Sequence, residues 1–342
     1  MKQPRIGAVL VCGFDSQTIV DRSMQSVVST MTELLRTLFF SVLLILAGCA
    51  TGHTAGIHDG KLQQLSVVVD GHTFALWSRA VTHSRGSILL LHGRTWSALP
   101  DFDLQIPGEQ RSIMMALNEH GYTAYAVDQR GYGSTPRDAS GWLTPDRAAA
   151  DLTGVLKWIA EHDHRPPTLV GWSRGSLISH LAVQAHPQLV ANLILVGYPR
   201  DPATTTPITD APVAPARVAT TRADATSDFI SPAVTPQILI DTYVQAALTA
   251  DPVRTDWRDL DQFNALDPAK ITVPTLLIQG ERDPLAPTAA QARFFTSLGT
   301  ADKQWVVLAG GDHAALLEDT MPAFIAAIVA FVERPAPLRT AR

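Results

Sequence analysis

The feature that most constrains the fold is a serine between two glycines, in the run Gly171-Trp172-Ser173-Arg174-Gly175. An apolar pair, Leu169 and Val170, precedes the run, and a segment with helical character, 177–184, follows it. A serine on a sharp turn between a strand and a helix needs small residues two positions away on each side, because larger side chains would collide with the neighbouring backbone. The run therefore predicts a strand, a strained turn carrying Ser173, and a helix.

An aspartate and a histidine follow at the ends of two further predicted strands. Residues 275–280 are apolar and end in glycine, which predicts a buried strand, and Asp283 lies in the turn after it. Residues 304–309 predict another strand, and His313 lies in the loop that follows. A serine hydroxyl is a weak nucleophile unless a histidine takes its proton, and a buried carboxylate stabilises the imidazolium that forms. We therefore expect Ser173, His313 and Asp283 to form a catalytic triad.

Other interpretations of these residues stay open at this point. Glu281 is a rival for the carboxylate, whereas Asp312 adjoins the histidine and would struggle to reach its far ring nitrogen. Ser173 would also suit a helix N-cap, and Asp283 with the following proline would suit a simple turn. The order serine, aspartate, histidine at strand ends favours the triad over these structural roles.

These motifs resemble the α/β-hydrolase fold superfamily over roughly residues 62–333. The resemblance implies an α/β fold with a mostly parallel central sheet, helices on both of its faces and a small helical cap insertion. The residues themselves predict an opening hairpin (65–69 and 74–77), and then parallel strands alternating with helices. One helix is expected to start at Thr144-Pro145 and the last near Thr320. The strands are predicted at 87–91, 123–127, 168–170, 193–196, 275–278 and 305–308.

The alternation breaks at about 199–268, which the resemblance implies to be the cap. A helix is predicted there from Pro236 to about Ala250. Four aromatic residues of this segment are expected either to line a substrate pocket or to pack the cap onto the main domain. They are Phe229, Tyr243, Trp257 and Phe263.

A second motif, His92-Gly93-Arg94, follows the predicted strand 87–91 and resembles the element that superfamily members place beside the nucleophile. A tetrahedral intermediate needs two backbone N–H donors. The resemblance assigns these to Arg94 and to Arg174, the residue after the serine. Because a cation at a helix start opposes the helix dipole, we expect the Arg174 side chain to find a carboxylate or solvent. Binding of an anionic substrate is the alternative.

Composition narrows the partners. The chain has 342 residues, 46% hydrophobic and 17% charged, and a net charge of −5. It is therefore not basic enough to suggest nucleic acid, and no glycine-rich phosphate loop is present. The segment 128–134 resembles a loop common in the superfamily rather than a dinucleotide site. His162 and His164 have no evident third ligand, so we predict neither a metal nor a cofactor.

The N-terminal region predicts export. Residues 38–46 form an uncharged apolar run of the length of a signal h-region, and residues 46–49 (Leu-Ala-Gly-Cys) resemble a bacterial lipobox. We expect a signal segment at 1–48, with 1–30 upstream of the true start. A lipidated tether follows at 49–60, a hydrolase domain at 61–334 and a flexible tail at 335–342. Acylation of Cys49 would hold the protein on a membrane of the bacterial envelope, facing the periplasm or exterior. A generic secretory signal and an N-terminal anchor helix are the alternatives.

The predicted activity is cleavage of a small ester-like substrate through an acyl-enzyme. Amidase or peptidase, lactonase, thioesterase and other reactions of the fold are alternatives, and a non-catalytic binding module is a third class. The resemblance speaks against proline iminopeptidases, which carry His-Gly-Gly-Pro-Gly where this chain has His92-Gly93-Arg94-Thr95-Trp96.

Overall fold

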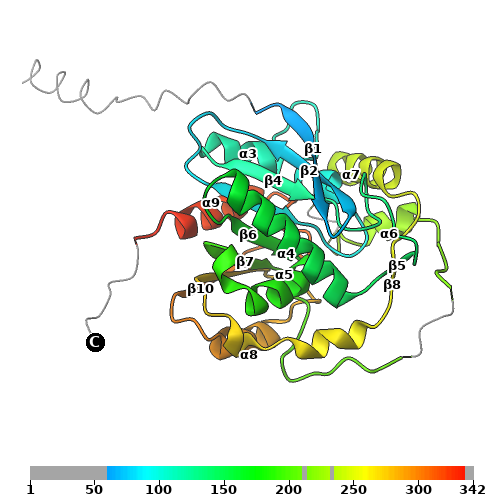
Figure 1. Ribbon diagram of the computed structural model, residues 1–342. Helices are drawn as coiled ribbons and strands as arrows, with labels where there is room; N and C mark the ends of the chain where they lie inside the picture. The colour runs from blue at the N-terminus through cyan, green and yellow to red at the C-terminus, as the bar shows by residue number, and fades with distance from the viewer. Residues whose placement is uncertain (1–59, 210–213, 232–234, 336–342) are drawn as a thin grey trace, which may run out of the picture. The chain divides into compact units, whose positions relative to one another are not determined.

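The computed structural model describes residues 60–209, 214–231 and 235–335 (Figure 1). The expected signal segment, Cys49 and all but the first residue of the predicted tail lie outside these ranges, so the domain boundaries stay predictions. Within the described part of the chain, no helix is both long and apolar enough to cross a bilayer.

An eight-stranded sheet in the order β1-β2-β4-β3-β6-β7-β9-β10 forms the centre of the fold. Its strands are β1 (Leu62–Val69), β2 (His72–Arg79), β3 (Ser87–Leu91), β4 (Thr123–Val127), β6 (Thr168–Trp172), β7 (Asn192–Val196), β9 (Thr275–Gly280) and β10 (Lys303–Leu308). Pairs β1–β2 and β2–β4 are antiparallel, and all other pairs are parallel. The predicted opening hairpin and parallel strands are confirmed. Asp70 and Gly71 form its turn with φ of 48° and 74°, the left-handed conformation that tight hairpins need.

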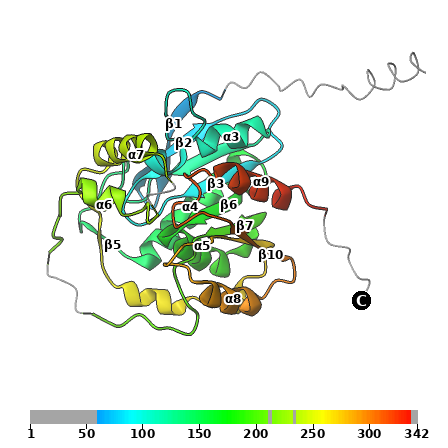
Figure 2. The same ribbon diagram turned by 180° about the vertical axis from the view of Figure 1, so that it is seen from behind.

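Helices cover both faces of the sheet, as predicted. On one face lie α4 (Pro145–His162), α5 (Arg174–Ala185) and α8 (Thr288–Ser297), and on the other α3 (Ile113–Glu119) and α9 (Met321–Val332) (Figures 1 and 2). The middle strands β3, β4, β6, β7 and β9 are buried along their whole length, which is why they are almost uniformly apolar rather than alternating. Helix α4 begins as expected, because the Thr144 side chain accepts from Arg147 N and Pro145 takes the first position.

The segment between β7 and β9 carries additional helices beside the carboxyl ends of the strands. It contains α6 (Arg222–Thr226), α7 (Gln237–Ala250), the short strand β8 (Asp256–Trp257) and two 3-10 turns, Leu260–Ala265 and Pro268–Lys270. Helix α7 matches the prediction and packs against α2 (Ala98–Phe102). Helix α6 was not predicted, because five residues are too few for a periodic pattern. Its start is set by a capping box between Thr221 and Asp224.

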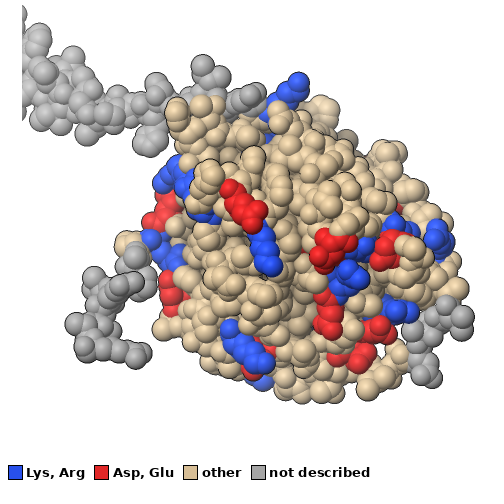
Figure 3. Space-filling model, viewed as in Figure 1, with Lys and Arg blue, Asp and Glu red and all other residues tan. Residues whose placement is uncertain are grey.

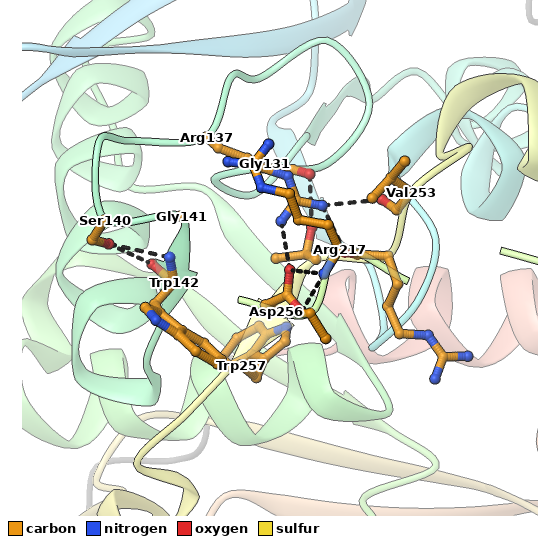
Figure 4. Close-up of polar contacts among 12 residues, drawn as sticks. Gly131, Arg137, Ser140, Gly141, Trp142, Arg217, Val253, Asp256 and Trp257 are labelled. Carbon is orange, nitrogen blue, oxygen red and sulfur yellow. Dashed lines mark hydrogen bonds and ion pairs between the residues drawn. The ribbon is translucent and has the colours of Figure 1, made fainter. Parts of the chain in front are cut away.

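A polar cluster fastens this segment to the main domain (Figure 4). Strand β8 pairs in parallel with β5 (Trp142–Leu143). Beside this pair, the Arg137 guanidinium contacts the Asp256 carboxylate at 3.2 Å and donates to the carbonyl of Val253 at 3.1 Å. Asp256 also accepts from the backbone N–H of Arg217 at 3.3 Å. Arg137, in the loop before α4, therefore contacts the part of the segment around Val253 directly. It is linked to the part around Arg217 through Asp256.

Charges of both signs are interspersed on the face that Figure 3 shows. Among the ion pairs of the described residues are those of Arg293 with Asp201 and of Arg334 with Asp302. This face therefore presents no basic stripe of the kind that tracks a nucleic-acid backbone.

Candidate active site

Ser173 lies on a strained turn between β6 and α5. Its φ and ψ are 54° and −122°, a conformation that side-chain-bearing residues adopt only where the surroundings enforce it. A Cβ on Gly171 would lie 2.5 Å from Ser179 Oγ, and one on Gly175 would lie 2.4 Å from the carbonyl oxygens of Leu91 and His92. The two glycines therefore let helix α5 approach β6 and β3, and the turn lifts Ser173 clear of the sheet.

The structure brings the three residues of the expected triad together. His313 Nε2 lies 2.8 Å from Ser173 Oγ, and His313 Nδ1 lies 2.8 Å from Asp283 Oδ2. Asp283 and His313 are buried, with 0% and 3% of their side chains exposed, whereas Ser173 is half-buried. Trp172, next to the serine, donates from its indole to the carbonyl of His313 at 2.9 Å and fixes the histidine loop.

The rival carboxylates are engaged elsewhere. Glu281 accepts from the backbone N–H of Gly310 at 2.7 Å, and Asp312 accepts from those of Ser231 and Ala314 at 2.6 and 2.8 Å. Asp283 uses its second oxygen to accept from Leu285 N at 2.8 Å. That bond orients the carboxylate so that its other oxygen faces the imidazole.

The backbone N–H groups of Arg94 and Arg174 flank the serine. Gly93 is close enough that a Cβ added to it would lie 3.4 Å from Ser173 Cβ. Within the described residues, neither the Arg94 N–H in the bend after β3 nor the Arg174 N–H at the first position of α5 donates to a turn or loop carbonyl. Both remain available to an oxyanion beside the serine.

Buried carboxylates hold the loop that carries Arg94. Asp128 accepts from Ala98 N at 2.9 Å, Asp251 accepts from Ser97 N at 2.8 Å, and Asp101 accepts from Gly93 N at 3.4 Å. Burial raises the pKa of Asp128 to about 6 and that of Asp101 well above its usual range. The segment 128–134, which resembles a loop common in the superfamily, thus supports the loop that carries Arg94.

His92 supports the same loop. It accepts from Gln129 N at Nε2 (3.0 Å) and lies 3.1 Å from the Gly93 carbonyl at Nδ1. Burial lowers the pKa of His92 to about 3, so the ring is neutral and can accept at Nε2 while donating at Nδ1. This is the structural role expected of a histidine that lies outside the triad.

With the site geometry established, comparison with known proteins places the chain in a family. A family model described as serine aminopeptidase, S33, matches residues 82–320. The chain belongs to this family. The mouse (Mus musculus) serine hydrolase BPHL is 27% identical over 225 residues, which cover 59% of this chain and 64% of that protein.

Solved structures show the same fold. A thermophilic esterase from Thermogutta terrifontis superposes with a TM-score of 0.58 at 18% identity, covering 79% of this chain and 98% of its own. A serine hydrolase involved in carbazole degradation superposes with a TM-score of 0.57 at 19% identity. The match covers 80% of this chain and 99% of that one. At these identities the likeness establishes the α/β-hydrolase fold alone. Membership of the serine aminopeptidase, S33, family places the chain in a family of hydrolases.

Two cavities of this S33 hydrolase meet at Ser173. The first has a volume of about 280 Å³ and is called here the acid-lined cavity. Asp101, Asp224 and Asp228 line it, together with Arg94 and Arg254. Arg254 pairs with Asp224 at 2.7 Å. Asp228 accepts from the Trp96 indole at 2.8 Å, and burial raises the pKa of Asp228.

The second is called the arginine-lined cavity and has a volume of about 400 Å³. Arg94, Arg174 and Arg200 line it beside Ser173, with Leu177, Leu260, Phe263 and Leu285 among its apolar residues. Of the two expected surroundings of the Arg174 side chain, a carboxylate is not found among the described residues, and the side chain is half-buried at the wall of this cavity. Its guanidinium lies 4.8 Å from the ring centre of Trp257 and forms no ion pair within the described residues.

Trp257 connects this cavity to the loop that carries Arg94. Its indole donates to the Tyr132 hydroxyl at 2.7 Å, and that hydroxyl donates to the Arg94 carbonyl. Of the other cap aromatics, Phe263 lines the arginine-lined cavity. Phe229 and Tyr243 are buried and pack edge to face at 5.2 Å. Both expected uses of the cap aromatics therefore occur.

Four charged residues that line the two cavities were not predicted from the sequence: Asp101, Asp228, Arg200 and Arg254. Arg200 follows the carboxyl end of β7, where ligands of open α/β sheets commonly bind, and that position was a usable signal. Asp228 and Arg254 lie in a cap without a repeating pattern, so only the fold reveals them. His162 stacks on Trp158 at 4.8 Å, and the described residues hold no group of three metal-ligating side chains.

Proposed function

We propose that this S33 hydrolase cleaves small ester-like substrates through an acyl-enzyme formed on Ser173. The observation that carries the proposal is the continuous chain Ser173 Oγ, His313 and Asp283, with both contacts at 2.8 Å. Ser173 attacks the carbonyl carbon while His313 takes its proton, and Asp283 stabilises the imidazolium. The amides of Arg94 and Arg174 bind the oxygen on which negative charge develops.

The second half returns the enzyme to its starting state. The tetrahedral intermediate collapses, the bond to the leaving group breaks, and His313 gives its proton to the departing oxygen. Water then attacks the acyl-enzyme and loses its proton to His313. Collapse of this second intermediate releases the carboxylic acid and returns the proton to Ser173. The chain's own residues supply every proton transfer in this cycle.

Substitution of the nucleophile tests the proposal. Ser173→Ala is expected to abolish labelling by a fluorophosphonate probe and to lower turnover of short 4-nitrophenyl esters by roughly 10⁴-fold or more. Ser179→Ala is the matched control, since Ser179 lies on α5, the helix that follows Ser173, and its hydroxyl has no hydrogen-bond partner within the described residues. Equal labelling of the Ser173 variant and the control would remove Ser173 from the mechanism.

Aminoacyl amide or peptide hydrolysis is the second candidate, and the acid-lined cavity favours it. Asp101 and Asp228 line that cavity together with Ser173, and carboxylates suit the ammonium of an unblocked N-terminus. A screen of one purified sample against esters, thioesters, lactones and aminoacyl amides separates the candidates. Activity confined to amides would overturn the ester proposal and leave the triad in place.

We also propose that the protein is lipid-anchored at Cys49 in the bacterial envelope. The Leu-Ala-Gly-Cys run that ends an apolar segment supports this. Each buried methylene contributes about 0.8 kcal/mol, so several acyl chains on one cysteine anchor firmly where one chain is marginal. Wild-type protein is expected in the membrane fraction and the Cys49→Ser variant outside it. Full-length protein in the cytosol with unmodified Cys49 would contradict the anchor.

A further inference from the structure

We propose that the preferred substrates of this enzyme are esters that also carry a carboxylate, and that Arg174, with Arg94 and Arg200, binds this group in the arginine-lined cavity. This inference rests on the proposed ester-hydrolase function. It adds the chemical class of the substrate and a second role for residues beside the nucleophile.

The first observation concerns the burial, the partners and the charge of the Arg174 side chain. This side chain is half-buried and lines the cavity, and within the described residues its guanidinium forms no hydrogen bond or ion pair. The buried Arg130, in contrast, is satisfied by Asp151 with contacts of 2.9 and 2.7 Å. Burial and the nearby cations Arg94 and Arg254 lower the pKa of Arg174 to about 10. It therefore keeps its charge at neutral pH, without a protein anion to balance it.

The second step is that, among the described residues, no unpaired carboxylate lines this cavity. Arg200 is held by neutral groups: Thr206 Oγ1 at 3.0 Å, the Thr204 carbonyl at 3.1 Å and Asn264 Oδ1 at 2.9 Å. Asp201 is the acidic residue that lines the same cavity, and it is paired with Arg293. The cavity therefore carries a net positive charge that an anionic ligand would balance.

The third step is the position of the arginines relative to the reacting bond. Ser173 lines both this cavity and the acid-lined one, so a substrate attacked at Ser173 has part of its length within reach of Arg174. A guanidinium fork matches a carboxylate with two parallel hydrogen bonds. The apolar residues Leu177, Leu260 and Phe263 border the same space, and they suit the methylene chain between the ester and the carboxylate.

The alternative role for Arg174 is structural. Stacked on Trp257, it would hold strand β8 against helix α5. Cation–π contacts contribute about 0.5–2 kcal/mol, enough to justify an arginine without a ligand. This role predicts equal losses for neutral and anionic substrates, whereas carboxylate binding predicts a loss confined to the anionic one.

The test compares two esters of equal length on the full protein. These are the 4-nitrophenyl monoester of adipic acid, which is anionic, and 4-nitrophenyl hexanoate, which is neutral. Wild type is expected to prefer the anionic ester in kcat/KM. Arg174→Gln should lower kcat/KM for the anionic ester by about 30-fold relative to the neutral one. Arg174→Lys, which keeps the charge, should recover part of the preference.

Arg258→Gln is the matched control, because it removes the same charge from an exposed arginine of the cap that lines neither cavity. Its ratio of anionic to neutral activity should equal that of wild type. A 3-carboxyphenyl ester of hexanoic acid places the carboxylate on the leaving group instead. A preference for either anionic ester that depends on Arg174 supports the inference.

Three results would each contradict a different part of the proposal. Wild type that is labelled by the fluorophosphonate probe and hydrolyses hexanoate, but shows no Arg174-dependent preference for either anionic ester, would overturn the carboxylate site alone. Wild type with neither labelling nor hydrolysis would instead overturn the proposed function on which the inference rests. A fall of equal size for both ester types in Arg174→Gln would assign the residue to the structural role.

Discussion

The two cavities that meet at Ser173 differ in how their charges are balanced. In the acid-lined cavity, Asp101 and Asp228 already accept hydrogen bonds from the protein, and burial raises their pKa values. In the arginine-lined cavity, Arg174 stays charged, and among the described residues the face of Trp257 is its one assigned partner. The raised pKa values mean that the carboxyl groups of the acid-lined cavity take up a proton more readily than exposed ones. Arg174, in the arginine-lined cavity, keeps its positive charge.

This difference suggests that the two cavities have different main tasks. The acids of the first cavity bind the loop that positions the Arg94 amide, so part of their role is to build the oxyanion site. Within the described residues, Arg174 and Arg200 form no ion pair, and Arg200 is held by neutral groups. Ligand binding is the task that we propose for Arg174. For each cavity, substitutions and pH changes distinguish residues that stabilise the protein's structure from residues that bind substrate.

The largest effect is expected from Asp283→Asn, which should lower kcat by about 10⁴-fold because the histidine then loses its orienting anion. Both cavities serve the same nucleophile, so neutral, anionic and cationic esters should lose activity alike. Glu281→Gln is the control and should stay near wild type, as Glu281 contacts only Gly310 N. A fall confined to one ester class would contradict a shared triad.

Next in size is Asp228→Asn, which removes a charge from the acid-lined cavity while its amide oxygen can still accept from Trp96. If this cavity attracts cations, selectivity for a choline ester over the uncharged 3,3-dimethylbutyl ester should fall about tenfold, equivalent to ~1.4 kcal/mol. Asp241→Asn, on the exposed surface of α7 beside Arg222, is the matched control. Unchanged selectivity would leave Asp228 with the loop-building role alone.

A smaller, several-fold effect is expected from pH. Because the pKa values of Asp101 and Asp228 are raised, lowering the pH from 8 to 5.5 adds protons to these carboxyls and removes negative charge. Selectivity for the choline ester should therefore fall as the pH falls. Arg174, with a pKa of about 10, stays charged throughout, so the preference for the adipate monoester should stay constant. Parallel kcat/KM profiles for the two substrate pairs check both statements.

The smallest effect is expected from Trp257→Leu. It removes the ring under Arg174 and the indole bond to Tyr132, with a loss of about 1–2 kcal/mol in the free energy of unfolding. The preference for the anionic ester should fall by a few-fold, since Arg174 loses its orientation but keeps its charge. Thermal unfolding and the two-ester ratio measure these separately. A ratio as low as that of Arg174→Gln would show that orientation, rather than charge, carries the selectivity.

Local sequence chemistry was sufficient for the strands and for the serine turn. The buried strands are continuous apolar runs, Thr144-Pro145 is a helix start on its own terms, and Gly171 and Gly175 mark the close approach of α5 to β6 and β3. The order of Ser173, Asp283 and His313 followed from their places at strand ends. Short elements such as α6 were not predicted, because one local cap and packing determine whether their few residues form a helix.

Local sequence patterns were enough to predict the fold class, the serine turn and the three residues expected at strand ends. The folded chain shows that Asp283 faces His313, because backbone N–H groups brought together by folding hold the carboxylates of Glu281 and Asp312 elsewhere. It also decided the fate of Arg174. A side chain at the start of a helix has no charge partner specified by its neighbours in sequence, and here the cap, distant along the chain, supplies an aromatic face in place of a carboxylate.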